Sequence, residues 1–137
     1  METALGPSGG RSVLVVDDND INLFVAVSLL KKAGYRTTTA KSGLEAVTAV
    51  ASTDFDAVLM DCHMPELDGF EATRRIRRLA SPRGTTPIIA LTASVLDEEL
   101  DRCLEAGMNT CLTKPVTLGV LISTLSKVFD VPGTQPE

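Results

Sequence analysis

Hydrophobic positions along the chain follow two alternating patterns, one typical of buried strands and one of helices. Short runs of apolar and β-branched residues predict strands, most of them buried on both faces. The expected strands are Val13–Val16, Tyr35–Ala40, Ala57–Met60, Ile88–Leu91 and Thr110–Thr113. Between them, apolar residues recur at helical spacing. The expected helices are Ile21–Ala33, Gly43–Ala51, Gly69–Leu79, Leu96–Ala106 and Thr117–Phe129.

Strand and helix thus alternate in five consecutive units, which predicts an α/β domain with one parallel sheet covered by helices on both faces. We expect this domain to span 12–129. Residues 1–11 are rich in glycine and small side chains, and we expect a flexible leader or linker there. Residues 130–137 contain two prolines and a glycine, and we expect a flexible tail.

Composition narrows the classes of protein. A length of 137 residues fits one domain, and no apolar run approaches the ~18 residues that span a bilayer. The net charge of −5 disfavours nucleic-acid binding, and we expect the arginines at 74, 75, 77 and 78 to form a solvated helix face. Three unpaired cysteines and a single histidine, His63, exclude a zinc cluster and indicate a reducing, cytoplasmic setting.

Polar residues follow the predicted strands at the point where each ends. Asp17 and Asp18 follow the first strand, Asp61 the third, Thr92 the fourth and Lys114 the fifth. The carboxyl ends of parallel strands share one edge of the sheet, where ligands bind in open α/β folds. Carboxylates gathered there suit Mg²⁺, and a lysine and a hydroxyl suit phosphate oxygens. The pattern predicts transfer of a phosphoryl group onto a carboxylate.

Four motifs in this order resemble the receiver domain of two-component response regulators. They are the pair Asp17-Asp18, the stretch Met60-Asp61-Cys62-His63-Met64-Pro65-Glu66-Leu67-Asp68-Gly69, then Leu91-Thr92-Ala93 and Thr113-Lys114-Pro115. The resemblance covers 12–129 and implies a flavodoxin-like, doubly wound (βα)5 fold with strand order 2-1-3-4-5. It also implies a cis peptide bond before Pro115.

The resemblance assigns a role to each matching residue. Asp61 is the expected phosphoryl acceptor, with Thr92 as switch hydroxyl and Lys114 as the phosphate-pairing lysine. Asp17, Asp18, Asp61 and the backbone carbonyl of His63 are the expected Mg²⁺ ligands. A histidine kinase or histidine phosphotransfer domain would be the donor. The output partner would bind the face formed by the last two helices and the strand between them.

One position departs from the family pattern. Cys111 stands where receivers usually carry a tyrosine or phenylalanine that turns inward on activation. Receivers of hybrid sensor kinases often lack that ring, and residues 103–116 resemble theirs, so we favour a hybrid sensor histidine kinase as the parent. On its own, the chain would show only self-phosphorylation and autodephosphorylation on Asp61. The alternatives are a stand-alone response regulator, a receiver that binds partners without phosphorylation, and an aspartyl phosphatase.

Overall fold

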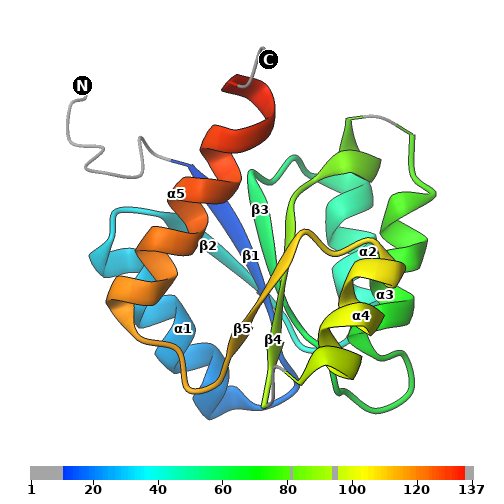
Figure 1. Cartoon of the computed structure of the whole chain (residues 1–137), viewed down its shortest axis with the longest axis horizontal. Coiled ribbons are helices and arrows are strands. Elements are labelled where there is room, and N and C mark those ends of the chain that lie inside the picture. Colours follow the sequence, from blue (N-terminus) through cyan, green and yellow to red (C-terminus); the bar gives the residue numbers. More distant parts are fainter. Residues whose placement is uncertain (1–10, 81, 94–95, 135–137) are drawn as a thin grey trace.

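A computed structural model describes residues 11–80, 82–93 and 96–134 of the chain (Figure 1). The expected leader, except for Arg11, and the last three residues of the expected tail lie outside this part. The strands are β1 (Ser12–Val16), β2 (Arg36–Ala40), β3 (Ala57–Asp61), β4 (Ile88–Thr92) and β5 (Thr110–Thr113). The helices are α1 (Asp20–Lys32), α2 (Gly43–Ser52), α3 (Gly69–Arg77), η2 (Arg83–Thr85), α4 (Asp97–Ala106) and α5 (Leu118–Thr134).

All five strands form one parallel sheet in the order β2-β1-β3-β4-β5, which confirms the fold and the strand order expected from the sequence. In the register, Val16 pairs with Ala40 and with Met60, so the carboxyl ends of three adjacent strands align. Thr92 pairs with Thr113 in the same way on the other side. The residues that follow these strands therefore meet at one edge.

Alternating side chains of each strand point to opposite faces, and each face has its own core. Leu14 and Val16 pack with α2, α3 and α4, whereas Val13 and Val15 pack with α1 and α5. Figure 1 shows the same division, with α1 and α5 on one side of the sheet and the other helices opposite. β3 and β4 are buried throughout, which explains their continuous apolar sequence.

Most helix boundaries follow from local chemistry. Asn19, Ser42 and Asp68 cap α1, α2 and α3 with side-chain oxygens that accept backbone N–H groups. α4 instead begins after Leu96, whose apolar side chain has no oxygen to accept a bond, and ends at Gly107 with a left-handed φ of 107°.

Two expectations from the sequence need correction. α5 continues past Phe129 to Thr134, so the backbone of 130–134 is helical. Pro132 and Gly133 disfavour helix, which is why the sequence suggested an earlier end. The arginine run of α3 is also not uniformly solvated: Arg77 is half-buried and donates to the carbonyl oxygens of Gly107 (2.8 Å) and Thr86 (2.7 Å). In the described part of the chain, no helix has the length and apolar character needed to cross a bilayer.

Candidate functional site

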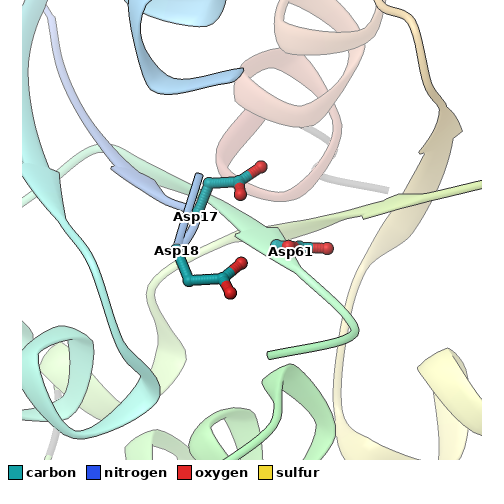
Figure 2. Close-up of side chains that lie close together, drawn as sticks. All are labelled: Asp17, Asp18 and Asp61. Carbon is teal, nitrogen blue, oxygen red and sulfur yellow. The ribbon is translucent and has the colours of Figure 1, made fainter. Parts of the chain in front are cut away.

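Three carboxylates converge at the carboxyl edge of the sheet. Asp17 and Asp18 directly follow β1, and Asp61 is the last residue of the adjacent β3. One oxygen from each lies within 4.8 Å of the others (Figure 2). Asp17 and Asp61 are only 1 % and 4 % exposed, whereas Asp18 is exposed. The sheet thus brings together the acidic residues that the sequence singled out.

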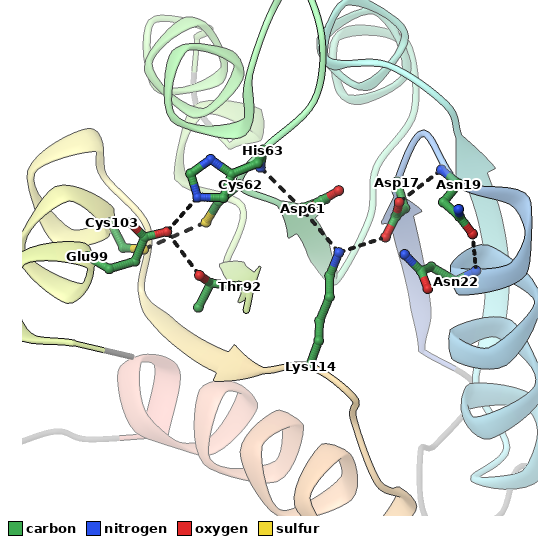
Figure 3. A network of polar contacts seen from close by, with 10 residues as sticks. All are labelled: Asp17, Asn19, Asn22, Asp61, Cys62, His63, Thr92, Glu99, Cys103 and Lys114. Atoms are coloured by element: carbon green, nitrogen blue, oxygen red, sulfur yellow. Dashed lines mark hydrogen bonds and ion pairs between the residues drawn. The ribbon is translucent and has the colours of Figure 1, made fainter. Parts of the chain in front are cut away.

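Lys114 extends across the end of β4 to reach this cluster. Its Nζ lies 3.1 Å from Asp61 Oδ1 and 3.3 Å from Asp17 Oδ2 (Figure 3). The peptide bond between Lys114 and Pro115 is cis, as the resemblance implied. The backbone N–H of Lys114 donates to the carbonyl oxygen of Thr92 at 2.8 Å, which ties the start of this loop to β4.

Burial and charge shift the ionisation of these groups. Burial raises the pKa of Asp61, and the negative charge of Asp17 raises it further, although Lys114 opposes both effects. Burial alone would lower the pKa of Lys114, but the carboxylates of Asp61 and Asp17 raise it overall. One ammonium pairs with two of the three clustered carboxylates, so the cluster keeps an excess of negative charge that favours an additional cation.

The donor set of the cluster fits Mg²⁺. This ion prefers oxygen ligands, keeps several waters and commonly combines one or two carboxylates with a phosphate. Two buried carboxylates beside an exposed one match that preference. The backbone N–H of His63 lies 3.3 Å from Asp61 Oδ1, so the main chain of His63 also borders the cluster. Its carbonyl oxygen remains a predicted ligand.

Thr92 ends β4 and hydrogen-bonds to a residue that the sequence analysis did not single out. Its hydroxyl donates to Glu99 Oε2 of α4 at 2.9 Å. The same carboxylate oxygen lies 2.8 Å from Nε2 of His63 (Figure 3). The side chain of His63 thus flanks the site, where it contacts Glu99. Glu99 lies in the first turn of α4, and the rule that ligands bind at strand ends does not point to a residue within a helix.

Neighbouring residues have structural roles. The carboxylate of Asp17 accepts the N–H of Asn19 at 2.9 Å, and Asp20 begins α1 and pairs with Lys41 at 2.7 Å. Cys62 and Cys103 are buried with their sulfurs 3.9 Å apart, and every cysteine is a free thiol. Cys111 is half-buried at the edge of the core below α4. Ser94, the residue two past Thr92, lies outside the described residues.

The fold and the convergent site define a phosphoryl-accepting class of α/β domain, and comparison with known proteins identifies the family. Residues 13–126 match the model of the response regulator receiver domain, and the chain belongs to this family.

Relatives with similar sequences are sensor histidine kinases. The chain is 42 % identical to the sensor histidine kinase RcsC of Escherichia coli (strain K12) over 125 residues, which are 91 % of this chain and 13 % of RcsC. It is 36 % identical to histidine kinase 3 of Arabidopsis thaliana over 143 residues, covering 90 % of this chain and 14 % of that protein. The chain thus spans a small fraction of the length of these relatives.

Two solved structures resemble this one closely. The receiver domain of the sensor histidine kinase PA1611 from Pseudomonas aeruginosa PAO1, with a magnesium ion coordinated in its active-site cleft, is 41 % identical with a TM-score of 0.80. The match covers 88 % of this chain and 98 % of that one. The receiver domain of Ssk1 from Saccharomyces cerevisiae, in complex with the histidine phosphotransfer protein Ypd1, is 32 % identical with a TM-score of 0.78. That match covers 86 % of this chain and 88 % of the other.

Proposed function

We propose that Asp61 accepts a phosphoryl group from a phosphohistidine. The observation that carries the proposal is the convergence of Asp17, Asp18 and Asp61 with the ammonium of Lys114 at the carboxyl edge of the sheet. Asp17, Asp18, Asp61 and the backbone carbonyl of His63 would hold Mg²⁺. The magnesium ion in the PA1611 receiver domain supports this assignment.

The reaction needs few protein groups. A carboxylate oxygen of Asp61 bonds to phosphorus as the phosphorus–nitrogen bond breaks, and the electron pair returns to the imidazole of the donor. Mg²⁺, when bound, neutralises charge on the phosphoryl oxygens and on the carboxylates. Lys114 supplies a second positive charge, and the Thr92 hydroxyl can donate to a phosphoryl oxygen. Attack of water on the acyl phosphate regenerates Asp61 and releases inorganic phosphate.

The phosphodonor would be a histidine kinase or a histidine phosphotransfer domain, as the complex of the Ssk1 receiver with Ypd1 supports. α1 offers an apolar surface beside the acceptor, because Phe24 and Ile21 are each 72 % exposed. A groove of about 320 Å³ lies between α1 and the loop after β5, lined among others by Asn22, Val25 and Pro115. An apolar helical face of the donor would cover this surface while its phosphohistidine reaches Asp61.

The output would be a changed binding surface on α4, β5 and α5. Exposed apolar residues on these helices, Leu104 of α4 and Val120 of α5, offer contact area for a protein partner. Phosphorylation would shift a pre-existing equilibrium between two arrangements of this face.

A hybrid sensor histidine kinase is the parent that we propose, because full-length relatives such as RcsC are sensor histidine kinases and the matching segment is a small part of them. A stand-alone response regulator is the alternative. We also propose a cytoplasmic location, which the three free thiols support.

The test is intact-protein mass spectrometry after incubation with acetyl phosphate or phosphoramidate, with and without Mg²⁺. We expect a single phosphoryl adduct that requires Mg²⁺ and is lost in Asp61→Asn. Asp54→Asn, which removes an exposed carboxylate far from the site, is the matched control and should leave the adduct unchanged. No adduct in the unaltered protein would favour a receiver that binds partners without phosphorylation. An adduct that survives in Asp61→Asn would mean that another residue is the acceptor.

A further inference from the structure

Glu99 lies between two residues of the site, at the first turn of α4. Its Oε2 accepts the hydroxyl proton of Thr92 at 2.9 Å and lies 2.8 Å from Nε2 of His63 (Figure 3). Its other oxygen lies 3.9 Å from a guanidinium nitrogen of Arg102, whose guanidinium stacks on the ring of Phe70 at 4.2 Å. Glu99 is thus held in place from several sides while it holds Thr92.

The carboxylate of Glu99 remains charged at neutral pH. Its side chain is only 15 % exposed, and this burial alone would raise its pKa. The hydrogen bonds with His63 and Thr92 outweigh burial and lower the pKa below its ordinary value. The bond from Thr92 to Glu99 is therefore charge-assisted, a class of hydrogen bond that is stronger than neutral ones.

The hydroxyl of Thr92 has one proton to donate. In the present structure Glu99 accepts that proton, yet a phosphoryl oxygen on Asp61 would need the same one. A carboxylate and a phosphoryl group are both acceptors and both negatively charged, so Thr92 cannot serve the two together. Phosphorylation must break the contact between Thr92 and Glu99 before Thr92 can reach the phosphoryl group.

We propose that Glu99 is a positioning residue that latches Thr92 in the unphosphorylated arrangement and competes with the phosphoryl group for its hydroxyl. The inference rests on the proposed function of Asp61 and adds a residue to it. The contacts of Glu99 with Thr92 and His63 also tie the first turn of α4 to the site. Release of Thr92 would therefore loosen the start of α4, which borders the proposed output face.

The experiment measures the affinity for beryllofluoride with Mg²⁺, a mimic of the phosphoryl group, by isothermal titration calorimetry. We expect Glu99→Ala to bind roughly tenfold more tightly than the unaltered protein, the low end of what a hydrogen bond to a charged group contributes. Glu99→Gln, whose amide oxygen is a weaker acceptor, should fall between the two. Glu98→Ala removes an exposed carboxylate from the same turn and should change affinity less than about twofold.

A double-mutant cycle separates the latch from simple charge repulsion. In the Thr92→Val background no hydroxyl remains to be latched, so Glu99→Ala should no longer change the affinity. An equal gain in both backgrounds would overturn the latch, because it would mean that Glu99 only repels the anion. Unchanged affinity in Glu99→Ala would also overturn it. Failure of the unaltered protein to bind beryllofluoride at all would overturn the proposed function, and the latch with it.

Discussion

At the scale of single residues, the fold places the negatively charged carboxylates of Asp17 and Asp61 close enough to repel each other. The pairing of β1 with β3 places two buried carboxylates side by side, and both depend on the ammonium of Lys114. Without a metal ion, the raised pKa of Asp61 means that its ionised form is less favourable in the folded protein than in the unfolded chain. The ionised carboxylate of Asp61 therefore lowers the stability of the fold in the absence of a bound cation.

Asp61→Asn should consequently stabilise the metal-free protein at pH 7, raising Tm by a few degrees, because the variant removes one buried charge. Because the pKa of Asp61 is raised, the ionised carboxylate lowers the free energy of unfolding at pH values above that pKa. This stability is regained as the pH falls through the pKa and the carboxylate is protonated. The advantage of the variant should shrink accordingly as the pH is lowered towards that range. Thermal unfolding followed by circular dichroism, in the presence of a chelator, measures both effects.

Mg²⁺ provides the control for this prediction. Binding to the folded state alone raises stability by mass action, so Mg²⁺ should raise Tm of the unaltered protein more than that of Asp61→Asn. A variant that is less stable than the unaltered protein in chelator would show that Lys114 compensates the two carboxylates fully.

At the scale of secondary-structure elements, Arg77 joins three segments. From the last turn of α3 its guanidinium donates to carbonyl oxygens of Gly107, Gly84 and Thr86 and to Oδ1 of Asn109, at 2.7–3.0 Å. These acceptors lie after α4, in η2 and before β4. Burial lowers the pKa of Arg77, but a guanidinium stays charged at any physiological pH.

Arg77→Lys should lower the free energy of unfolding by about 2 kcal/mol or more, because an ammonium cannot reach four acceptors in different directions and leaves partly buried carbonyls unpaired. Urea unfolding measures the change. Arg78→Lys, an exposed neighbour on the same helix, is the control and should stay within about 0.5 kcal/mol of the unaltered protein. Equal losses in the two variants would contradict a specific role for Arg77.

The contacts of Arg77 also illustrate which features could not be predicted from the sequence. Hydrophobic periodicity predicted every strand and long helix, and the parallel arrangement brought Asp17, Asp61 and Lys114 together as expected, because strand ends depend only on element order. Glu99 and Arg77 depend on the direction and reach of long side chains on helices. That information is set by helix packing and does not appear in spacing along the chain.

At the scale of the whole molecule, the site lies between two surfaces. α1 and α5 cover one face of the sheet and α2, α3 and α4 cover the other (Figure 1). The exposed apolar residues of α1, Phe24 among them, lie on one side of the acceptor. On the other side α4 borders it through Glu99. A donor on α1 would thus leave α4, on the opposite face of the sheet, accessible.

Phe24→Ala should slow phosphoryl transfer from a phosphorylated histidine phosphotransfer domain by roughly tenfold, the usual effect of removing a central aromatic contact. Transfer from acetyl phosphate should be unchanged, because a small donor needs no protein surface. Phosphorylation rates with the two donors give the comparison. Val120→Ala, an exposed apolar residue of α5, is the control. Equal slowing with both donors would mean that Phe24 maintains the structure of the acceptor site and does not contribute to binding of the protein donor.

The two ends of α4 differ in a way that determines how this helix can move. At its C-terminal end, Gly107 has a left-handed conformation and its carbonyl is bound by Arg77, and a β-carbon there would lie 2.9 Å from the Arg77 side chain. At its N-terminal end, Glu99 contacts Thr92 and His63, and by our proposal the contact with Thr92 is lost when Asp61 is phosphorylated. We therefore expect α4 to rotate as a rigid body about its C-terminal end at Gly107, which stays fixed. The displacement of the helix backbone should increase from Gly107 towards Leu96. A partner that binds the first turn of α4 would therefore contact the part of the helix that moves most.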